Sequence, residues 1–211
     1  MVDKISLLAQ HKPVLYERLC KVAKWRQAGV TLVLECVQSP TNLGAIIRSC
    51  DGLGVASVRY LPTERQAQEG RLVFRSSVSA SDWVDWQEID GLKGYFDRLK
   101  GEGVTLFATS PDPAGVDLHE VDFADYEKIA LVVGSESQGL SEEAMGRADV
   151  RLRIPMRGMV QSLNVSVATA IILSQVCQQR QDPRFLLDQQ GQRALIAHWA
   201  TKVLDKKHFI K

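Results

Sequence analysis

The chain has 211 residues, of which 45% are hydrophobic and 24% are charged, and its formal net charge is +1. These proportions are typical of one ordinary folded domain and argue against a disordered or membrane-embedded protein. No apolar run is long enough to span a bilayer, and the N-terminal segment lacks the apolar stretch of a signal peptide. We therefore expect a cytoplasmic protein.

The charge is distributed unevenly along the chain. Residues 1–27 carry six Lys/Arg against two acidic residues, and residues 193–211 carry five against one, which leaves a net charge of −7 for residues 28–192. Two basic ends fit a bound polyanion, because phosphate contacts supply most of the affinity of nucleic-acid-binding proteins. Solvated helix surfaces explain the same pattern equally well on charge alone.

The cysteines and histidines do not form a metal-binding pattern. None of the four cysteines stands in a C-x-x-C pair, and none of the four histidines has the spacing of a zinc ligand. We expect reduced cysteines in the core and no bound metal.

Apolar runs rich in β-branched residues predict five strands, and helical patterns lie between them. The strands are expected at 31–37, 57–61, 104–109, 129–133 and 150–154. Helices are expected at 43–53 and 92–100, in a short stretch capped by Ser141, and at about 164–180, with a last helix near 191–204 after Pro183. This alternation predicts an α/β fold with a parallel sheet and helices on both faces.

Open α/β sheets bind ligands at the carboxyl ends of their strands, so the loops after the strands are the candidate sites. After the first strand, Asn42 stands near the start of a helix and Arg48 follows among apolar and small residues. If buried, such an arginine should meet either a carboxylate, in a structural salt bridge, or a phosphate.

The loop after the fourth strand, Gly134 to Ser141, nearly matches the phosphate-binding pattern G-x-x-x-x-G-K-[ST]. Leu140 occupies the lysine position, which argues against an NTPase. Gly134 and Gly139 bracket Glu136, and we expect their backbone to pass close to a ligand.

After the fifth strand, a partly apolar loop runs from Ile154 to Ser162 and Asn164. Its apolar side chains and backbone polar groups suit the binding of an adenine with a thioether tail. Ser162 or Asn164, taken alone, also fits simple capping of the next helix.

In order along the chain, the segments N-x-G-A-I-I-R, G-x-E-x-x-G-L-S and I-P-M-x-G-M-V-Q-S-L-N-V-S-V-A resemble the three motifs of the SpoU branch of the SPOUT RNA methyltransferases. The resemblance extends from about Thr31 to Gln181. It implies a deep C-terminal trefoil knot, a homodimer, and methyl transfer from S-adenosyl-L-methionine (AdoMet) to the ribose 2′-hydroxyl of a tRNA guanosine, at D-loop position 18. It also divides the chain into a basic N-terminal helical extension at 1–27, a methyltransferase domain at 28–181 and a basic C-terminal helical extension at 182–211.

The resemblance implies roles for individual residues. Catalysis is expected from five residues: Arg48, Asn42, Glu136, Ser162 and Asn164. AdoMet is expected to contact eight residues: Thr109, Gly134, Glu136, Gly139, Ile154, Met156, Ser162 and Leu163. RNA is expected to contact Arg48 and basic residues of the two ends: Lys12, Lys21, Lys24, Arg26, Lys206 and Lys207.

The role of Arg48 has two versions. The family residue that it matches is held to activate the hydroxyl, but a guanidinium has a pKa above roughly 12 and rarely releases its proton. A clamp on phosphate that also stabilises the developing alkoxide is the physically easier role.

No DNA or membrane partner is expected. Alternatives are a SpoU enzyme acting on rRNA or on another tRNA position, and an RNA-binding member of the fold without activity. Gln38, Ser39 and Ser137 stand where bacterial tRNA relatives tend to carry basic residues, which leaves the substrate more open than the chemistry.

Overall fold

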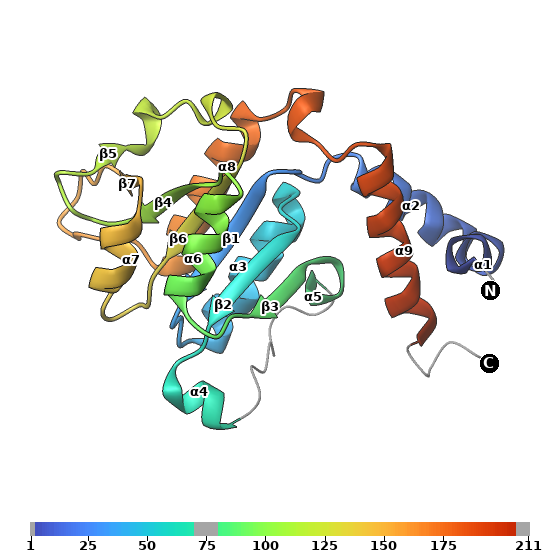
Figure 1. The fold of residues 1–211 in the computed structure, drawn as a ribbon, viewed down its shortest axis with the longest axis horizontal. Helices are drawn as coiled ribbons and strands as arrows, with labels where there is room; N and C mark the ends of the chain where they lie inside the picture. Colours follow the sequence, from blue (N-terminus) through green and yellow to red (C-terminus); the bar gives the residue numbers. More distant parts are fainter. Residues whose placement is uncertain (1–2, 70–79, 206–211) are drawn as a thin grey trace. The chain divides into compact units, whose positions relative to one another are not determined.

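A computed structural model describes residues 3–69 and 80–205 of the chain (Figure 1). The chain forms two compact units. One unit comprises residues 29–180, and the other is formed by both ends, residues 1–28 and 181–211.

The unit of residues 29–180 is built on one seven-stranded parallel sheet, with strand order β3-β2-β1-β6-β4-β7-β5. Its strands are β1 (Val30–Glu35), β2 (Ser57–Leu61), β3 (Asp85–Glu88), β4 (Thr105–Thr109), β5 (Val116–Asp117), β6 (Ile129–Val133) and β7 (Val150–Arg153). Its helices are α3 (Pro40–Leu53), α4 (Glu64–Glu69), α5 (Ala80–Trp83), α6 (Leu92–Gly101), α7 (Glu142–Arg147) and α8 (Val165–Gln179), with short 3-10 turns at Leu118–Glu120 and Phe123–Asp125.

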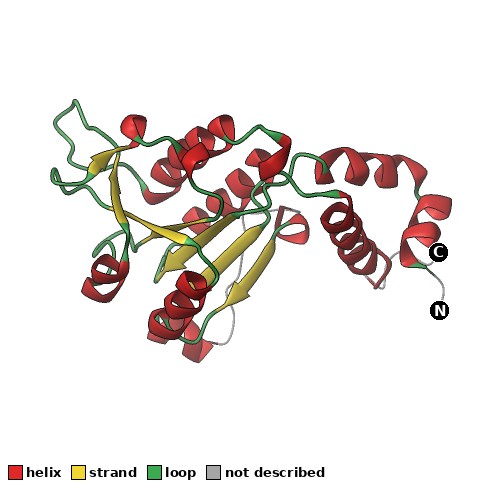
Figure 2. Cartoon of the chain, turned by 45° about the horizontal axis from the view of Figure 1, so that its top comes forward, coloured by secondary structure: helices red, strands yellow, loops and turns green. Residues whose placement is uncertain are grey.

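Helices cover both faces of this sheet, as Figure 2 shows. Successive residues of a strand point to opposite faces, and β1 illustrates the result. Leu32 and Leu34 pack in the core that includes residues of α3 and α8, whereas Val33 packs in the core that includes residues of α6 and α7. The central strand β6 is buried along its whole length. The predicted class, a parallel sheet with helices on both faces, is confirmed.

All five predicted strands are present, two of them with the predicted boundaries and three with ends shifted by one or two residues, and the predicted helices are present as well. The strands β3 and β5 were not predicted from the sequence. β5 has only two residues, and β3 consists of Asp-Trp-Gln-Glu, which has no apolar run. Both strands lie at the edges of the sheet, where pairing can be held by polar contacts instead of a buried side-chain pattern.

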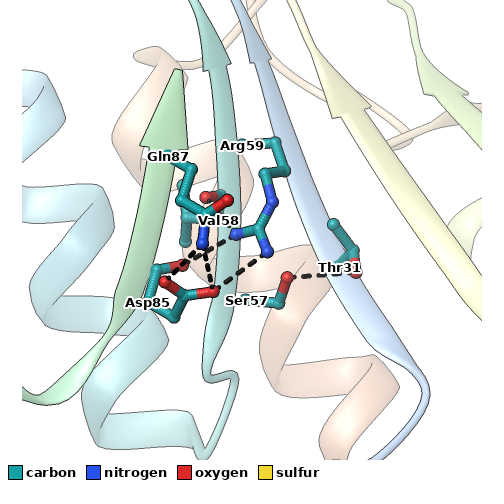
Figure 3. Close-up of polar contacts among 6 residues, drawn as sticks. All are labelled: Thr31, Ser57, Val58, Arg59, Asp85 and Gln87. Atoms are coloured by element: carbon teal, nitrogen blue, oxygen red, sulfur yellow. Dashed lines mark hydrogen bonds and ion pairs between the residues drawn. The ribbon is translucent and has the colours of Figure 1, made fainter. Parts of the chain in front are cut away.

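Figure 3 shows how β3 is attached to its neighbour β2. The Arg59 guanidinium donates to the Asp85 carboxylate at 2.9 Å, and also to the backbone carbonyls of Val58 at 2.9 Å and Asp85 at 3.0 Å. Gln87 donates to the same carboxylate at 3.0 Å. One arginine thus joins two strands through side-chain and backbone acceptors together, which allows a polar segment to complete the sheet edge.

The second unit consists of α1 (Lys4–His11), α2 (Pro13–Ala23) and α9 (Gln189–Asp205), with a 3-10 turn at Pro183–Phe185. Its core includes Leu8, Leu19 and Trp199. Arg26 is also fully buried, with its guanidinium carbon 5.3 Å from the centroid of the Trp199 ring. The roles assigned to the basic ends by sequence remain predictions.

No helix in the described ranges is both long and apolar enough to cross a membrane.

Candidate active site

The chain leaves β1 through a turn in an uncommon backbone conformation and enters α3 at a capped N-terminus. Cys36 has a φ of 54°, in the left-handed region that residues other than glycine seldom adopt, and its N–H donates to the Leu61 carbonyl at 2.9 Å. Ser39 caps α3, because its Oγ accepts a hydrogen bond from the Asn42 N–H at 3.3 Å. The helix begins at Pro40, three residues earlier than predicted, so Asn42 lies inside its first turn.

The loop after β6 is a tight hairpin. The N–H groups of Ser135 and Gly139 each donate to the other residue's carbonyl, both at 3.0 Å. A Cβ on Gly134 would lie 2.1 Å from the carbonyl carbon of Gly139, and Gly139 has a φ of 70°. Close packing of the loop on itself therefore explains why position 134 requires glycine, while the expected contact of the Gly134 backbone with a ligand stays a prediction.

The far end of this loop is held by a buried carboxylate that was not predicted from the sequence. Glu35, the last residue of β1, is 6% exposed and accepts a hydrogen bond from the Ser141 N–H at 2.9 Å. Ser141 in turn caps α7, as predicted, by accepting from the Ala144 N–H at 3.1 Å. The hairpin is thus fixed between the ends of two neighbouring strands and the start of a helix.

The carboxylate of Glu136 is bound by three donors from the start of α3. Its Oε2 accepts from the Gln38 N–H at 3.0 Å, and its Oε1 accepts from the Ser39 N–H at 3.1 Å and from Nδ2 of Asn42 at 2.8 Å. Glu136 is exposed, and the partial desolvation of its carboxylate by neighbouring atoms would alone raise its pKa, but these hydrogen bonds hold the pKa below its ordinary value. Glu136 is therefore an ionised acceptor at neutral pH, and a poor general base.

Asn42 links Glu136 to the third motif. Its Oδ1 accepts from Nδ2 of Asn164 at 3.2 Å, while Oδ1 of Asn164 accepts from the N–H and the Oγ of Ser166 at 2.9 and 2.7 Å. Asn164 is thus the N-cap of α8 and a member of the site at once. One run of hydrogen bonds, Glu136 to Asn42 to Asn164, connects the segments after β1, β6 and β7. The interacting backbone N–H groups of Gln38 and Ser39 were missed, and the only sequence signal for them was the Ser-Pro start of a helix.

Arg48 is exposed on α3, although Ile46 and Ile47 beside it are fully buried. Within the described ranges the structure records no hydrogen bond or ion pair for Arg48. The alternative of a buried structural salt bridge is therefore wrong. The guanidinium is accessible to an anion from solvent, and within the described residues it has no hydrogen bond to Asn42, Glu136 or Asn164.

The residues expected to contact AdoMet follow β4, β6 and β7, which are adjacent in the order β6-β4-β7. Thr109 ends β4 and donates from Oγ1 to the Val132 carbonyl at 3.0 Å. Ile154, Met156 and Leu163 are half-buried, and Ser162 is exposed.

In the described chain, residues 156–163 make no recorded backbone hydrogen bonds. Unused backbone donors and acceptors beside half-buried apolar side chains fit an adenine ring and a thioether. No cluster of three or more His, Cys, Asp or Glu suited to a metal ion occurs in residues 3–69 and 80–205.

The expected RNA-binding residues differ in accessibility. Lys21 and Lys24 are exposed and Lys12 is half-buried, but Arg26 is fully buried. Arg26 therefore belongs to the core of its unit and is withdrawn from the RNA-binding set. Lys206 and Lys207 lie outside the described residues.

The sequence and the fold both match known proteins. The model of the SpoU rRNA Methylase family matches residues 29–174, which is more than half of the chain. The chain belongs to the SpoU methylase family.

Three relatives illustrate the range of this SpoU family. A tRNA (guanosine(18)-2′-O)-methyltransferase from Thermus thermophilus is 38% identical over 88% of this chain and 95% of its own. The crystal structure of the Aquifex aeolicus TrmH/SpoU tRNA modifying enzyme has a TM-score of 0.80 at 32% identity, covering 90% of this chain and 96% of its own. An AdoMet-bound rRNA methyltransferase from Sinorhizobium meliloti has a TM-score of 0.63 at 25% identity, covering 76% of this chain and 59% of its own.

Gly134→Ala should destabilise the protein strongly. The new Cβ would meet backbone atoms that cannot rotate away, so we expect a loss of more than about 2 kcal/mol in the free energy of unfolding. Gly146→Ala is the control, because no atom lies within 4 Å of a Cβ built at Gly146 in α7. Urea unfolding of both variants checks this, and equal stability of the two would contradict the hairpin geometry.

Glu136→Gln should reduce stability at pH 7 by about 1 kcal/mol, because an amide cannot accept from all three donors as the carboxylate does. The folded-state pKa of Glu136 is lowered, so its stabilisation is present above the unfolded pKa of about 4.3 and is lost as pH falls through the folded pKa. The difference between parent and variant should therefore shrink in acid.

Urea unfolding at pH 7 and at about pH 3.5 measures this difference. The matched control is Glu120→Gln, at an exposed glutamate with no recorded hydrogen bond in the described ranges. A difference for Glu136→Gln that stayed constant across the range would show that the ionised carboxylate is not what stabilises the site.

Proposed function

We propose that this protein transfers a methyl group from AdoMet to the ribose 2′-hydroxyl of a guanosine in tRNA, at D-loop position 18. The observation that carries the proposal is the hydrogen-bonded run from Glu136 through Asn42 to Asn164, which joins three sequence-distant motifs at the carboxyl ends of parallel strands of one sheet. The activity of the Thermus thermophilus relative, a tRNA (guanosine(18)-2′-O)-methyltransferase, supports the same substrate. A tRNA substrate also fits the cytoplasmic location expected from sequence.

AdoMet supplies an electrophilic methyl group carried on a sulfonium. In this chain, AdoMet would be held by eight residues that follow β4, β6 and β7: Thr109, Gly134, Glu136, Gly139, Ile154, Met156, Ser162 and Leu163. Apolar side chains after β7 would cover the adenine and the thioether, and the free backbone groups there would satisfy the polar edge of the ring. We also propose that this segment carries the trefoil knot that the family resemblance implies.

As the ribose oxygen forms its new bond to the methyl carbon, the carbon–sulfur bond would break and the hydroxyl proton would pass to solvent water, because the hydrogen-bonded Glu136 carboxylate is a poor base. Arg48 would hold an RNA phosphate and stabilise the negative charge that develops on the ribose oxygen. Its exposure and the lack of an ion pair in the described chain support this role, because an arginine already paired with a carboxylate would have little capacity left for phosphate. The site around the ribose would be formed by Glu136, Asn42, Ser162 and Asn164, and Glu136 would act as a fixed hydrogen-bond acceptor.

Two alternatives remain distinct from this proposal. One alternative is a SpoU enzyme that acts on rRNA or on another tRNA position; an rRNA substrate is favoured by the name of the SpoU rRNA Methylase family and by the rRNA methyltransferase relative, which is 25% identical. A non-catalytic RNA-binding protein would be free to lose the site, yet Asn42, Arg48, Glu136, Ser162 and Asn164 are all present. Their presence favours an enzyme.

The direct test uses purified protein, AdoMet and a tRNA transcript that carries guanosine 18. We expect 2′-O-methylguanosine at this position, detected by nucleoside mass spectrometry, and none in a transcript with adenosine there. Methylation of rRNA fragments but not of tRNA would support the first alternative. AdoMet-independent RNA binding without any product would support the second.

In the same assay, Arg48→Ala should lower single-turnover methylation by roughly 100-fold or more, as expected for removal of one preorganised electrostatic group. Arg48→Lys should restore little, because an ammonium lacks the planar fork that can hold two oxygens together. AdoMet affinity should change little in either variant. Arg151→Ala is the control, since Arg151 is another exposed arginine with no recorded partner in the described ranges. Near-parental turnover by Arg48→Ala would contradict the assigned role.

We further propose that the protein is a homodimer that uses the surface between α3 and α8. A groove of about 580 Å³ lies there, lined by Ala45 and Ser49 of α3 and by α8 residues that include Val167 and Ile171. Val167 is 47% exposed and Ile171 is 37% exposed, and α8 contains no charged residue in its 15 residues. Depletion of charge with exposed apolar side chains is typical of an interface core. Arg48 lies beside Ser49, so such a dimer would bring the partner close to the proposed catalytic arginine.

Ile171→Glu should convert the dimer to a monomer, because it buries a charge in the proposed interface. Sedimentation at micromolar concentration measures the change. Val116→Glu provides the control, since Val116 is a similarly exposed apolar residue, at 42%, on β5 and outside the groove. A monomeric parent, or an Ile171→Glu variant that sediments like the parent, would contradict this assignment.

A further inference from the structure

Helix α2 and the turn after it expose one face on which two basic residues lie between two large apolar residues. The face consists of Val14, Arg18, Lys21 and Trp25. Successive members lie four, three and four positions apart, which places them on the same side of a helix of about 3.6 residues per turn. All four are exposed, Val14 at 81% and Trp25 at 66%. Trp25 follows the helix end by two residues, and its N–H still donates to the Val22 carbonyl at 3.1 Å, which continues the turn.

The exposure of Trp25 is not the result of a loose segment. The residue after it, Arg26, is fully buried against Trp199, and the Arg26 carbonyl accepts from the Leu187 N–H at 2.9 Å. Ala28 then donates to the Phe185 carbonyl at 2.8 Å. Before Trp25, Leu19 and Ala23 are buried on the opposite side of α2. The backbone is thus anchored on both sides of Trp25, while the indole is left in solvent.

A tryptophan held outward in this way is unusual, because indole burial is among the largest hydrophobic contributions that a side chain can make. The described residues provide no ring or cation partner for it. A fixed, exposed aromatic ring beside cations is the arrangement that proteins use to stack an unpaired base while contacting the phosphates next to it.

The charge of the surrounding unit favours a polyanion as the occupant. Residues 1–28 and 181–211 together contain twelve Lys/Arg and five Asp/Glu, whereas residues 29–180 contain fourteen against twenty. Glu17 is exposed on the flank of the same face of α2, and it is the single acidic residue of that helix. The balance on this face remains basic.

We propose that this face of α2 binds tRNA, with the Trp25 indole stacked on an exposed base and with Arg18 and Lys21 contacting phosphates. The inference rests on the proposed tRNA substrate and adds a residue to it that neither the motifs nor the charge pattern singles out. Stacking on a π-face is independent of base identity, so Trp25 contributes affinity and position without selecting the methylated nucleotide.

The test measures the Kd of the full-length protein for the guanosine-18 tRNA transcript at several salt concentrations. Trp25→Ala should weaken binding by about fivefold or more, as expected for the loss of one stacked base, and should leave the slope of log Kd against log salt unchanged, because no cation is removed. Lys21→Ala should instead reduce the slope by roughly 0.7 to 0.9. Lys93→Ala, at an exposed lysine of α6, is the charge control and should leave both quantities as in the parent.

Two further variants separate stacking from simple apolar contact. Trp25→Phe keeps an aromatic face and should retain most of the affinity, whereas Trp25→Leu keeps apolar surface without one and should bind like Trp25→Ala. Parental tRNA affinity in Trp25→Ala would overturn the inference, even while methylation by the parent left the proposed function intact. A parent that neither binds nor methylates tRNA would instead remove the proposed function itself. A change from dimer to monomer in Trp25→Ala, seen by sedimentation, would assign this face to a contact between copies of the chain and would also overturn the inference.

Discussion

The carboxylate of Glu136 is the point on which the geometry of the candidate site depends. It lies in the loop after β6, yet all three of its donors belong to the segment that opens α3. The ion and the start of the helix stabilise each other, because a carboxylate near a helix N-terminus satisfies N–H groups that have no partner within the helix. Since Asn42 is both a donor to Glu136 and an acceptor from Asn164, the same carboxylate indirectly orients the cap of α8.

Parallel topology makes this connection possible. The strands β1 and β6 are adjacent, with Leu34 paired to Val133 at their carboxyl ends, so the loops that follow them leave the sheet side by side. A buried carboxylate at the end of β1, Glu35, binds the far end of the β6 loop through the Ser141 N–H. Each strand end therefore contributes one carboxylate that holds the loop of the other. Two such contacts fix the hairpin against α3 more firmly than either could alone, which is the preorganisation that a binding site needs.

The sequence predicted the part of this structure that periodicity and motif order encode. The central strands are largely apolar, so their position and parallel arrangement follow from composition, and the order of motifs identified Asn42, Glu136 and Asn164 as candidate site residues. The pairing among these residues was not predictable, because backbone N–H groups such as those of Gln38 and Ser39 leave no signature in the side-chain pattern. The strand β3 was missed for a different reason: its attachment depends on the contact between Arg59 and Asp85, and its sequence lacks apolar alternation. The basic charge of Arg26 led to a wrong prediction of RNA contact. Its sequence context resembles that of the exposed Lys24, but the Arg26 guanidinium packs on the Trp199 ring.

The distribution of charge suggests how affinity and chemistry are divided within the chain. The unit that contains the candidate site has a net charge of −6, and a polyanion gains little from approaching it except at local cations such as Arg48. The unit formed by the two ends has a net charge of +7 and therefore supplies most of the long-range attraction. Weak general affinity around the proposed catalytic arginine would have an advantage, because RNA that is held mainly through the basic unit would have few strong contacts to break at the candidate site itself. On this view, substitutions in the basic unit act chiefly on RNA affinity and its salt dependence, while substitutions at Arg48 and around Glu136 act chiefly on the rate of methyl transfer.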